Sequence, residues 1–233
     1  MMMKRYILAF LLVLSPLATS NIYAEEPLEG LQLATAPINR DDMESIKRGA
    51  KVFATTCMTC HTLVYLRYDK LAQEAGITID KMPLNVKTWP NGVTPPDLSL
   101  EASVRGVDWI YTYLHSFYKD TARPTGVNNL VFPNAAMPAI LAPYQGEQVL
   151  VEHPVHDISG DIEWYDAVKL VHQGTMTPEQ YDAYTADIVN FLAYAAEPYH
   201  ADQHRIGKWV LGFLLFFSVL AYMLKKEYWK DVK

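Results

Sequence analysis

The sequence predicts an all-α domain with long loops, exported from the cytoplasm and followed by one C-terminal transmembrane helix. Three observations support this fold class. The chain begins with a short apolar leader, apolar residues recur at helical spacing near both ends of the following domain, and residues 206–224 form one long apolar run. Each of these elements has a separate physical justification.

Residues 1–24 have the order of a secretory signal peptide. Lys4 and Arg5 precede an apolar run over residues 6–14, and a stretch of small and polar residues ends at Ala24. This run is too short to span a membrane, so an uncleaved N-terminal anchor is the less favoured interpretation. We therefore expect the mature chain to start near residue 25, outside the cytoplasm.

Residues 25–205 are long enough to form one globular domain with a hydrophobic core. They contain 13 Lys and Arg against 24 Asp and Glu, a formal charge of −11, whereas the whole chain carries −6. This charge argues against a nucleic-acid partner and suits a cationic protein partner. Acidity that only keeps an exported domain soluble explains the charge equally well. The acidic stretch 147–163 remains without an assigned role.

The first helix of the domain is expected to begin after Asp41, which can cap it. Ile46, Ala50 and Phe53 follow at spacings of four and three and give this helix one apolar face. Gly49 lies on the same segment, where the missing side chain allows another helix to approach closely.

A second helix is expected from about Leu63, through Tyr65 and Leu66, to residue 75, where Gly76 is a natural C-terminal stop. The last helix of the domain begins with a capping box at residues 177–180, with proline at the first helical position. Its apolar stripe contains Tyr181, Tyr184, Ile188, Phe191, Leu192 and Ala195.

Residues 206–224 are interrupted by one charge, Lys208, at the outer edge of the run, and this length predicts a transmembrane helix. Lys225 and Lys226 follow directly, so the positive-inside rule places the tail 225–233 in the cytoplasm. The aromatic residues near the two ends, as expected at a membrane interface, are Trp209, Tyr222, Tyr228 and Trp229. A buried core helix is the alternative interpretation.

Both cysteines of the chain fall in one motif, in which Cys57 and Cys60 are followed directly by His61. This Cys-x-x-Cys-His pattern is the attachment signature of c-type haem. Two thiols on one turn can each bond a haem vinyl group, while the adjacent imidazole reaches the iron. A redox-active thiol pair, a zinc site and a small-loop disulfide are the alternatives, and the rest of the sequence favours none of them.

The second axial ligand of such a haem decides between electron transfer and small-molecule binding. Met137 is the favoured ligand, because prolines 133 and 138 stiffen its segment while two alanines let the backbone approach a flat macrocycle. Met176 and Met82 are alternatives, and Met82 lies only a short stretch of chain beyond His61. The histidines that remain as weaker candidates are His115, His153, His156 and His172.

Several segments together resemble the cytochrome c1 family, the haem-c subunits of quinol:cytochrome c oxidoreductase. The residues that carry this resemblance are Cys57, Met58, Thr59, Cys60 and His61; Pro95, Pro96, Asp97, Leu98 and Ser99; residues 132–138; Ala195, Ala196, Glu197 and Pro198; and the C-terminal anchor. The resemblance covers essentially the whole mature chain and is strongest for the bacterial form, which implies a haem domain in the periplasm and a single-pass anchor in the inner membrane.

The resemblance implies a cytochrome c-like domain with one covalently bound haem c, reduced by a Rieske iron-sulfur protein and oxidised by a soluble cytochrome c. It also implies an anchor beside cytochrome b in a dimeric complex. The implied cofactor-binding residues are Cys57, Cys60, His61, Met137, Pro95, Pro96, Leu98, Arg105, Phe132 and Pro133, with His61 and Met137 on the iron. Arg105 corresponds to an arginine near a haem propionate, while Ser103 and Trp109 depart from the arginine and tyrosine found in some members.

The function expected from these features is outer-sphere transfer of single electrons, in which this chain makes and breaks no bond. A haem subunit of a terminal oxidase, or another membrane-anchored electron carrier, is the nearest alternative. A haem enzyme such as a peroxidase, with an open iron position, is a more distant one.

Overall fold

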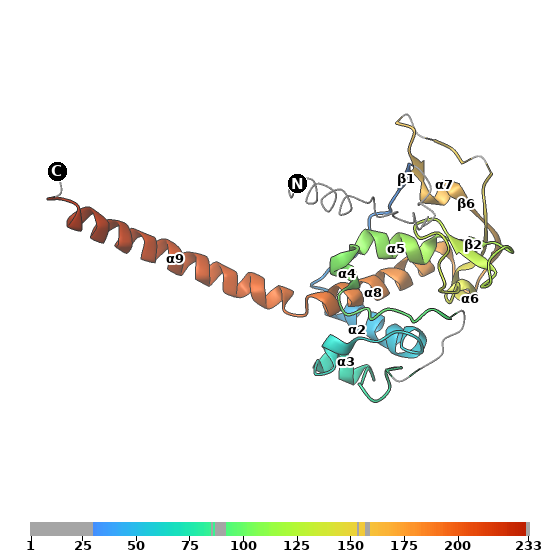
Figure 1. Cartoon of the computed structure of the whole chain (residues 1–233), viewed down its shortest axis with the longest axis horizontal. Coiled ribbons are helices and arrows are strands. Elements are labelled where there is room, and N and C mark those ends of the chain that lie inside the picture. Colours follow the sequence, from blue (N-terminus) through green and yellow to red (C-terminus); the bar gives the residue numbers. More distant parts are fainter. Residues whose placement is uncertain (1–29, 85, 87–91, 153, 157–158, 232–233) are drawn as a thin grey trace, which may run out of the picture.

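The computed structural model describes residues 30–84, 86, 92–152, 154–156 and 159–231. The expected signal peptide therefore lies outside the described residues. Helices gather in one domain, and a single long helix extends from it (Figure 1). The predicted class, a mostly helical domain with one C-terminal apolar helix, is confirmed.

Helix α2 spans Met43–Val52, and its N-cap is Asp42 and not the expected Asp41. The Asp42 carboxylate accepts hydrogen bonds from the backbone N–H groups of Glu44 and Ser45, which fixes the first turn. The helix continues into a wider turn, η1, over Phe53–Cys57. This π-helical turn carries the chain directly into the cysteine motif.

Helix α8 spans Pro178–Ala196 and begins with the predicted capping box between Thr177 and Gln180. It packs against α2 at the predicted point of close approach, because a Cβ at Gly49 would overlap the Asp187 carbonyl group. Phe53 and Phe191 meet there with ring centroids 5.7 Å apart. The crossing of α2 and α8 is therefore the centre of the domain.

The expected helix after the motif is split in two. Val64–Leu66 form one 3₁₀ turn, η2, and Lys70–Glu74 form helix α3 with Asp69 as its cap. Tyr65 is 66% exposed and so does not belong to an apolar face. Gly76 adopts the expected left-handed conformation after α3, with φ of 90°.

Two further helices, α4 at Glu101–Val104 and α5 at Val107–His115, pack on α8 (Figure 1). Together with α2 and α3 they enclose the main hydrophobic core. Its largest fully buried apolar side chains are Ile46, Phe53, Leu63, Leu66, Ile77, Ile188 and Phe191.

Among the residues that the structure describes, three short two-stranded sheets complete the domain, and the sequence did not predict them. Parallel strands β1 and β5 are Leu31–Gln32 and Ile162–Glu163; antiparallel β2 and β3 are Phe117–Lys119 and Val127–Asn129; antiparallel β4 and β6 are Gly146–Leu150 and Val168–Gln173. Short helices α6, Ala142–Gln145, and α7, Trp164–Ala167, precede β4 and β6. The described part of the acidic stretch 147–163 thus contributes strands to two of these sheets.

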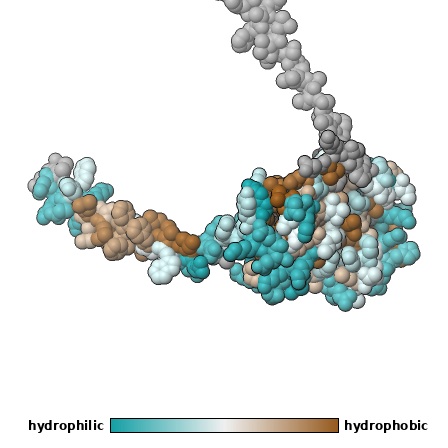
Figure 2. Space-filling model, turned by 90° about the horizontal axis from the view of Figure 1, so that it is seen from below, coloured by the Kyte–Doolittle hydropathy of each residue, from teal (hydrophilic) through white to brown (hydrophobic). Residues whose placement is uncertain are grey.

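Helix α9 spans His200–Tyr228 and contains the whole predicted span 206–224. Its segment Arg205–Tyr228 is long and apolar enough to cross a membrane, and its most apolar window is 0% buried within the chain. Figure 2 shows this helix as an apolar rod with hydrophilic residues at both ends. An exposed apolar helix of this length is typical of a membrane anchor, and the alternative of a buried core helix is excluded.

Candidate functional site

The cysteine motif forms a compact turn at the end of η1. The backbone N–H groups of Cys60 and His61 both donate to the Cys57 carbonyl oxygen, at 3.0 and 2.9 Å. Both cysteines are free thiols. Burial, and secondarily the neighbouring Cys60, raises the pKa of the Cys57 thiol to about 12. A thiol of such high pKa is a poor redox nucleophile, which argues against the thiol-exchange interpretation.

The imidazole of His61 is held by a carbonyl from a distant segment. Its Nδ1 lies 2.8 Å from the Pro96 carbonyl oxygen, so that Nδ1–H donates and the Nε2 lone pair stays available. Burial lowers the pKa of His61. The neutral imidazole with a free Nε2 is the form that coordinates a metal.

Asp97 ties the segment around Pro96 to the end of the motif. Its Oδ2 accepts hydrogen bonds from the Thr62 hydroxyl at 2.6 Å and the Val64 N–H at 2.9 Å, and its Oδ1 accepts one from the Ser99 N–H. Burial by itself raises the pKa of Asp97, but the hydrogen bonds from Ser99, Thr62 and Val64 outweigh it and hold that pKa below its ordinary value. The ionised carboxylate therefore keeps the Pro96 carbonyl beside His61.

Proline and leucine flank this carboxylate. Pro95 is half-buried, Pro96 is exposed, and Leu98 packs against the main core while its N–H donates to the Thr62 carbonyl. The structure thus brings Pro96 and Leu98 beside the motif, through the contacts of Pro96 with His61 and of Leu98 with Thr62.

The four methionines considered at this site differ in their surroundings. Met58 and Met82 are buried in the main core, and Met176 packs against it. Met137 is half-buried and belongs to neither hydrophobic cluster of the described residues. The side chain of Met82 is therefore committed to the protein interior, whereas that of Met137 is not part of either cluster.

Arg105 lies against an aromatic row. Its guanidinium sits 4.3 Å from the Trp109 ring centroid and 5.3 Å from that of Phe132, while its Nε donates to Glu101 at 2.6 Å. Trp109 stacks on Tyr113 in turn, at 5.1 Å. The structure brings together Arg105 and Phe132, two residues that the resemblance places at the cofactor site. It adds the aromatic row, which the helical spacing of residues 109 and 113 could have indicated.

Two buried asparagines, Asn128 and Asn129, hold the start of the loop that carries Met137. Asn129 is 0% exposed, and its Oδ1 accepts hydrogen bonds from the N–H groups of Val131 and Phe132. The sequence analysis missed these residues. Adjacent asparagines directly before an apolar run were the available signal, because buried amides need specific partners.

The histidines occupy varied positions. His115 is buried between Tyr111 and Asp182, His156 and His172 are exposed, and His153 lies outside the described residues. Within the part of the chain that the structure describes, no group of three or more His, Cys, Asp or Glu side chains could hold a metal ion.

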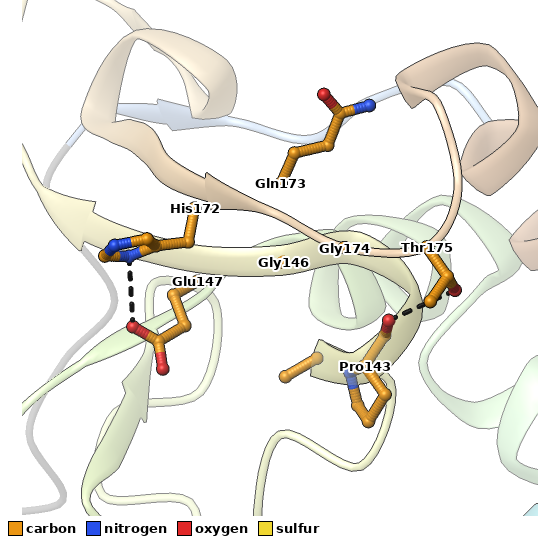
Figure 3. A pocket seen from close by; sticks show the side chains of 8 residues that line it. Pro143, Gly146, Glu147, His172, Gln173, Gly174 and Thr175 are labelled. Atoms are coloured by element: carbon orange, nitrogen blue, oxygen red, sulfur yellow. Dashed lines mark hydrogen bonds and ion pairs between the residues drawn. The ribbon is translucent and has the colours of Figure 1, made fainter.

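A surface pocket of about 580 Å³ lies apart from the motif, between the α6–β4 turn and the end of β6 (Figure 3). Glu147 and His172 face each other across its rim at 3.4 Å, and the Thr175 hydroxyl donates to the Pro143 carbonyl. None of its lining residues belongs to the cysteine motif or to residues 130–138.

Together, a thiol pair, an imidazole oriented by a carbonyl, two crossing helices and an exposed apolar anchor define a class: the membrane-anchored c-type cytochromes. The chain belongs to the cytochrome c1 family, whose model, described as "Cytochrome C1 family", matches residues 34–89 and 74–232. Membership in this family implies a covalently bound haem c. The free thiols and the available Nε2 of His61 fit such a group.

Individual relatives agree with this assignment. Cytochrome c1 of Allochromatium vinosum is 43% identical over 99% of this chain and 100% of its own length. A protein of Nitrosomonas europaea named ammonia monooxygenase gamma subunit is 39% identical over 87% of this chain and 89% of its own length. Cytochrome c1 of Blastochloris viridis is 27% identical over 84% of both chains.

Proposed function

We propose that this chain carries one haem c bonded through Cys57 and Cys60, with His61 and Met137 as the axial iron ligands. In this role it passes single electrons from a Rieske iron-sulfur protein to a soluble cytochrome c within the quinol:cytochrome c oxidoreductase. The observation that carries the proposal is the 2.8 Å contact between His61 Nδ1 and the Pro96 carbonyl, directly beside two free thiols.

When bound, the haem supplies an iron that alternates between the ferrous and ferric states. The chain supplies the environment of that iron. The Pro96 carbonyl orients the His61 ring, and Asp97 holds that carbonyl in place. Met137 would supply a thioether ligand to the iron, which would favour the ferrous state and exclude small-molecule ligands.

Side chains around this position shape the rest of the pocket. Arg105, fixed by Glu101 and the rings of Trp109 and Phe132, offers a cation for a haem propionate. Pro95, Pro133 and Leu98 complete the apolar lining. Apolar surroundings disfavour the additional positive charge of ferric iron and so raise the midpoint potential.

The ligand assignment is tested by a matched pair of methionine variants. Met137→Leu should abolish the weak red absorption band of an iron–sulfur bond and lower the midpoint potential. Met176→Leu, which changes a methionine that packs on the core, should change neither. The reverse result would transfer the ligand role to Met176.

Partners and location follow from the same role. We propose that α9 anchors the chain once in the bacterial inner membrane, beside cytochrome b in a dimeric complex, with the acidic domain in the periplasm and the C-terminus in the cytoplasm. A cationic soluble cytochrome c would be attracted to a domain of formal charge −11. Nucleic acid is not a partner of such a surface.

Gentle detergent extraction, followed by identification of the co-purifying subunits, tests the assembly. Cytochrome b and a Rieske protein should accompany the chain. The relative named ammonia monooxygenase gamma subunit gives a specific second candidate: co-purification with monooxygenase subunits, and without cytochrome b, would favour that assembly. Terminal oxidase subunits in the preparation would instead support the remaining alternative, a haem subunit of a terminal oxidase.

A further inference from the structure

The loop that leads to Met137 starts from a short β-hairpin. Strand β3 pairs with β2, with Asn129 opposite Phe117 and Asn128 opposite Tyr118. Strand β2 itself directly follows helix α5, which packs on α8. The two asparagines are therefore held beside a helix of the main core, eight and nine residues before Met137.

The side-chain amide of Asn129 forms hydrogen bonds through both its nitrogen and its oxygen. Its Nδ2 donates to the Tyr113 carbonyl at the end of α5, at 2.8 Å. Its Oδ1 accepts from the N–H groups of Val131 and Phe132, at 2.9 and 3.1 Å, and from the Ser116 hydroxyl at 3.3 Å. One fully buried amide thus connects the helix terminus to the first turn of the loop.

Asn128 fixes the next point of the same loop. Its Oδ1 accepts from the Asn134 N–H at 2.8 Å, and its Nδ2 donates to Asp120 at 3.2 Å. Asn134 has a positive φ of 61°, a backbone conformation that residues other than glycine adopt infrequently, so the backbone reverses direction there. Only Ala135 and Ala136 separate this anchored residue from Met137.

We infer that Asn128 and Asn129 are positioning residues for the sulfur ligand: their amides fix the loop backbone and thereby set the reach of Met137 toward the iron. The inference rests on the proposed role of Met137. Loss of the Asn129 amide removes the acceptor of the buried Val131 N–H, and loss of the Asn128 amide removes the acceptor that holds the Asn134 N–H, so the loop backbone is held less firmly in either variant. The thioether then competes less well for the iron, while the thiols and His61 are untouched.

The test uses the full haem-loaded chain in its membrane complex, with Asn129→Ala and Asn128→Ala as the variants. Gln148→Ala is the matched control, because Gln148 is also a buried amide, donating to the His115 and Phe117 carbonyls next to the same hairpin without touching the loop. The readouts are haem content, the red absorption band, the midpoint potential, and the pH at which that band disappears on alkaline titration.

Both asparagine variants should keep their haem, lower the midpoint potential, and lose the red band at a lower pH than the wild type. Gln148→Ala should retain wild-type values even where it lowers thermal stability. Should Asn129→Ala fail to assemble, Asn128→Ala decides, since it leaves the Asn129 side chain in place and removes the acceptor of the Asn134 N–H, together with that of the Asn129 N–H. Equal shifts in the control and the asparagine variants would overturn the inference.

Met137→Leu is measured in parallel, so that two different failures can be separated. If Met137→Leu keeps the red band, the ligand assignment fails, and the inference with it. If Met137→Leu loses the band while both asparagine variants retain wild-type band, potential and alkaline transition, the ligand assignment stands and the positioning role alone is refuted.

Discussion

Replacement of Gly49 by alanine tests the crossing of α2 and α8 that carries the motif. Helix propensity favours the change by about 1 kcal/mol, because alanine is the better helix former. The added Cβ, however, would overlap the Asp187 carbonyl group and lie 2.7 Å from the Phe191 Cβ. These two effects oppose each other, and their magnitudes decide the outcome.

Relief of the overlap requires the helices to separate, because the obstructing atoms are backbone and Cβ and not the end of a flexible side chain. A gap of about 0.5–1 Å forfeits a quarter to a half of each dispersion contact, and Phe53 and Phe191 meet at this crossing. Overpacking costs about 1–3 kcal/mol, and a backbone clash belongs at the upper end. After the propensity gain, we expect a net loss of about 2 kcal/mol.

Thermal unfolding of the haem-loaded chain in detergent, followed by far-ultraviolet circular dichroism, measures this loss. A decrease of about 2 kcal/mol corresponds to a Tm about 4–8 °C lower for a domain of this size. Gly207→Ala is the control, since a Cβ at that position in α9 would meet nothing within 4 Å, and the Tm should not fall. A Gly49→Ala protein that melts at or above the wild-type temperature would refute the close helix crossing.

Three further outcomes are expected. Thr177→Ala removes the hydroxyl that caps α8 and should destabilise the domain by about 1 kcal/mol, measured by thermal unfolding; an unchanged Tm would contradict the capping role. Because the pKa of Asp97 is lowered on folding, its stabilisation is present above its unfolded pKa of about 3.9 and is lost as the pH falls through the lower folded pKa. In the Asp97→Asn variant, the free energy of unfolding should therefore fall less steeply with decreasing pH, as measured by urea unfolding at several acidic pH values. The same pH dependence in the variant and the wild type would contradict this contribution of Asp97. Turnover with a cationic cytochrome c should slow as salt shortens the screening length from about 30 Å at 0.01 M to about 8 Å at 0.15 M; a salt-independent rate would remove the electrostatic docking hypothesis.

Segments whose structure depends on neighbouring residues were predicted well. The capping box at Thr177, the stop at Gly76 and the apolar anchor were all recognised from the sequence, because each depends on residues a few positions apart. The close approach at Gly49 was also predicted, although the partner helix could only be guessed.

The predictions of local structure were wrong where two local conformations were compatible with the same residues. Asp41 and Asp42 are both residues that cap helices well, and in the structure the Asp42 carboxylate accepts the N–H groups of Glu44 and Ser45. Likewise, the segment after the motif has helical spacing throughout, yet Asp97 accepts the Val64 N–H and turns the chain there, which leaves Tyr65 exposed.

By itself, the sequence determined the attachment motif, the acidity of the domain and the apolar C-terminal helix, because spacing, charge and hydrophobicity along the chain are sufficient for each. Only the tertiary structure decided which carbonyl orients His61 and which amides hold the loop before Met137. The partners of these contacts, Pro96 for His61 and Tyr113 for Asn129, lie 35 and 16 residues away. Hydrogen bonds over such separations form only after the helices have packed, so that no local pattern records them.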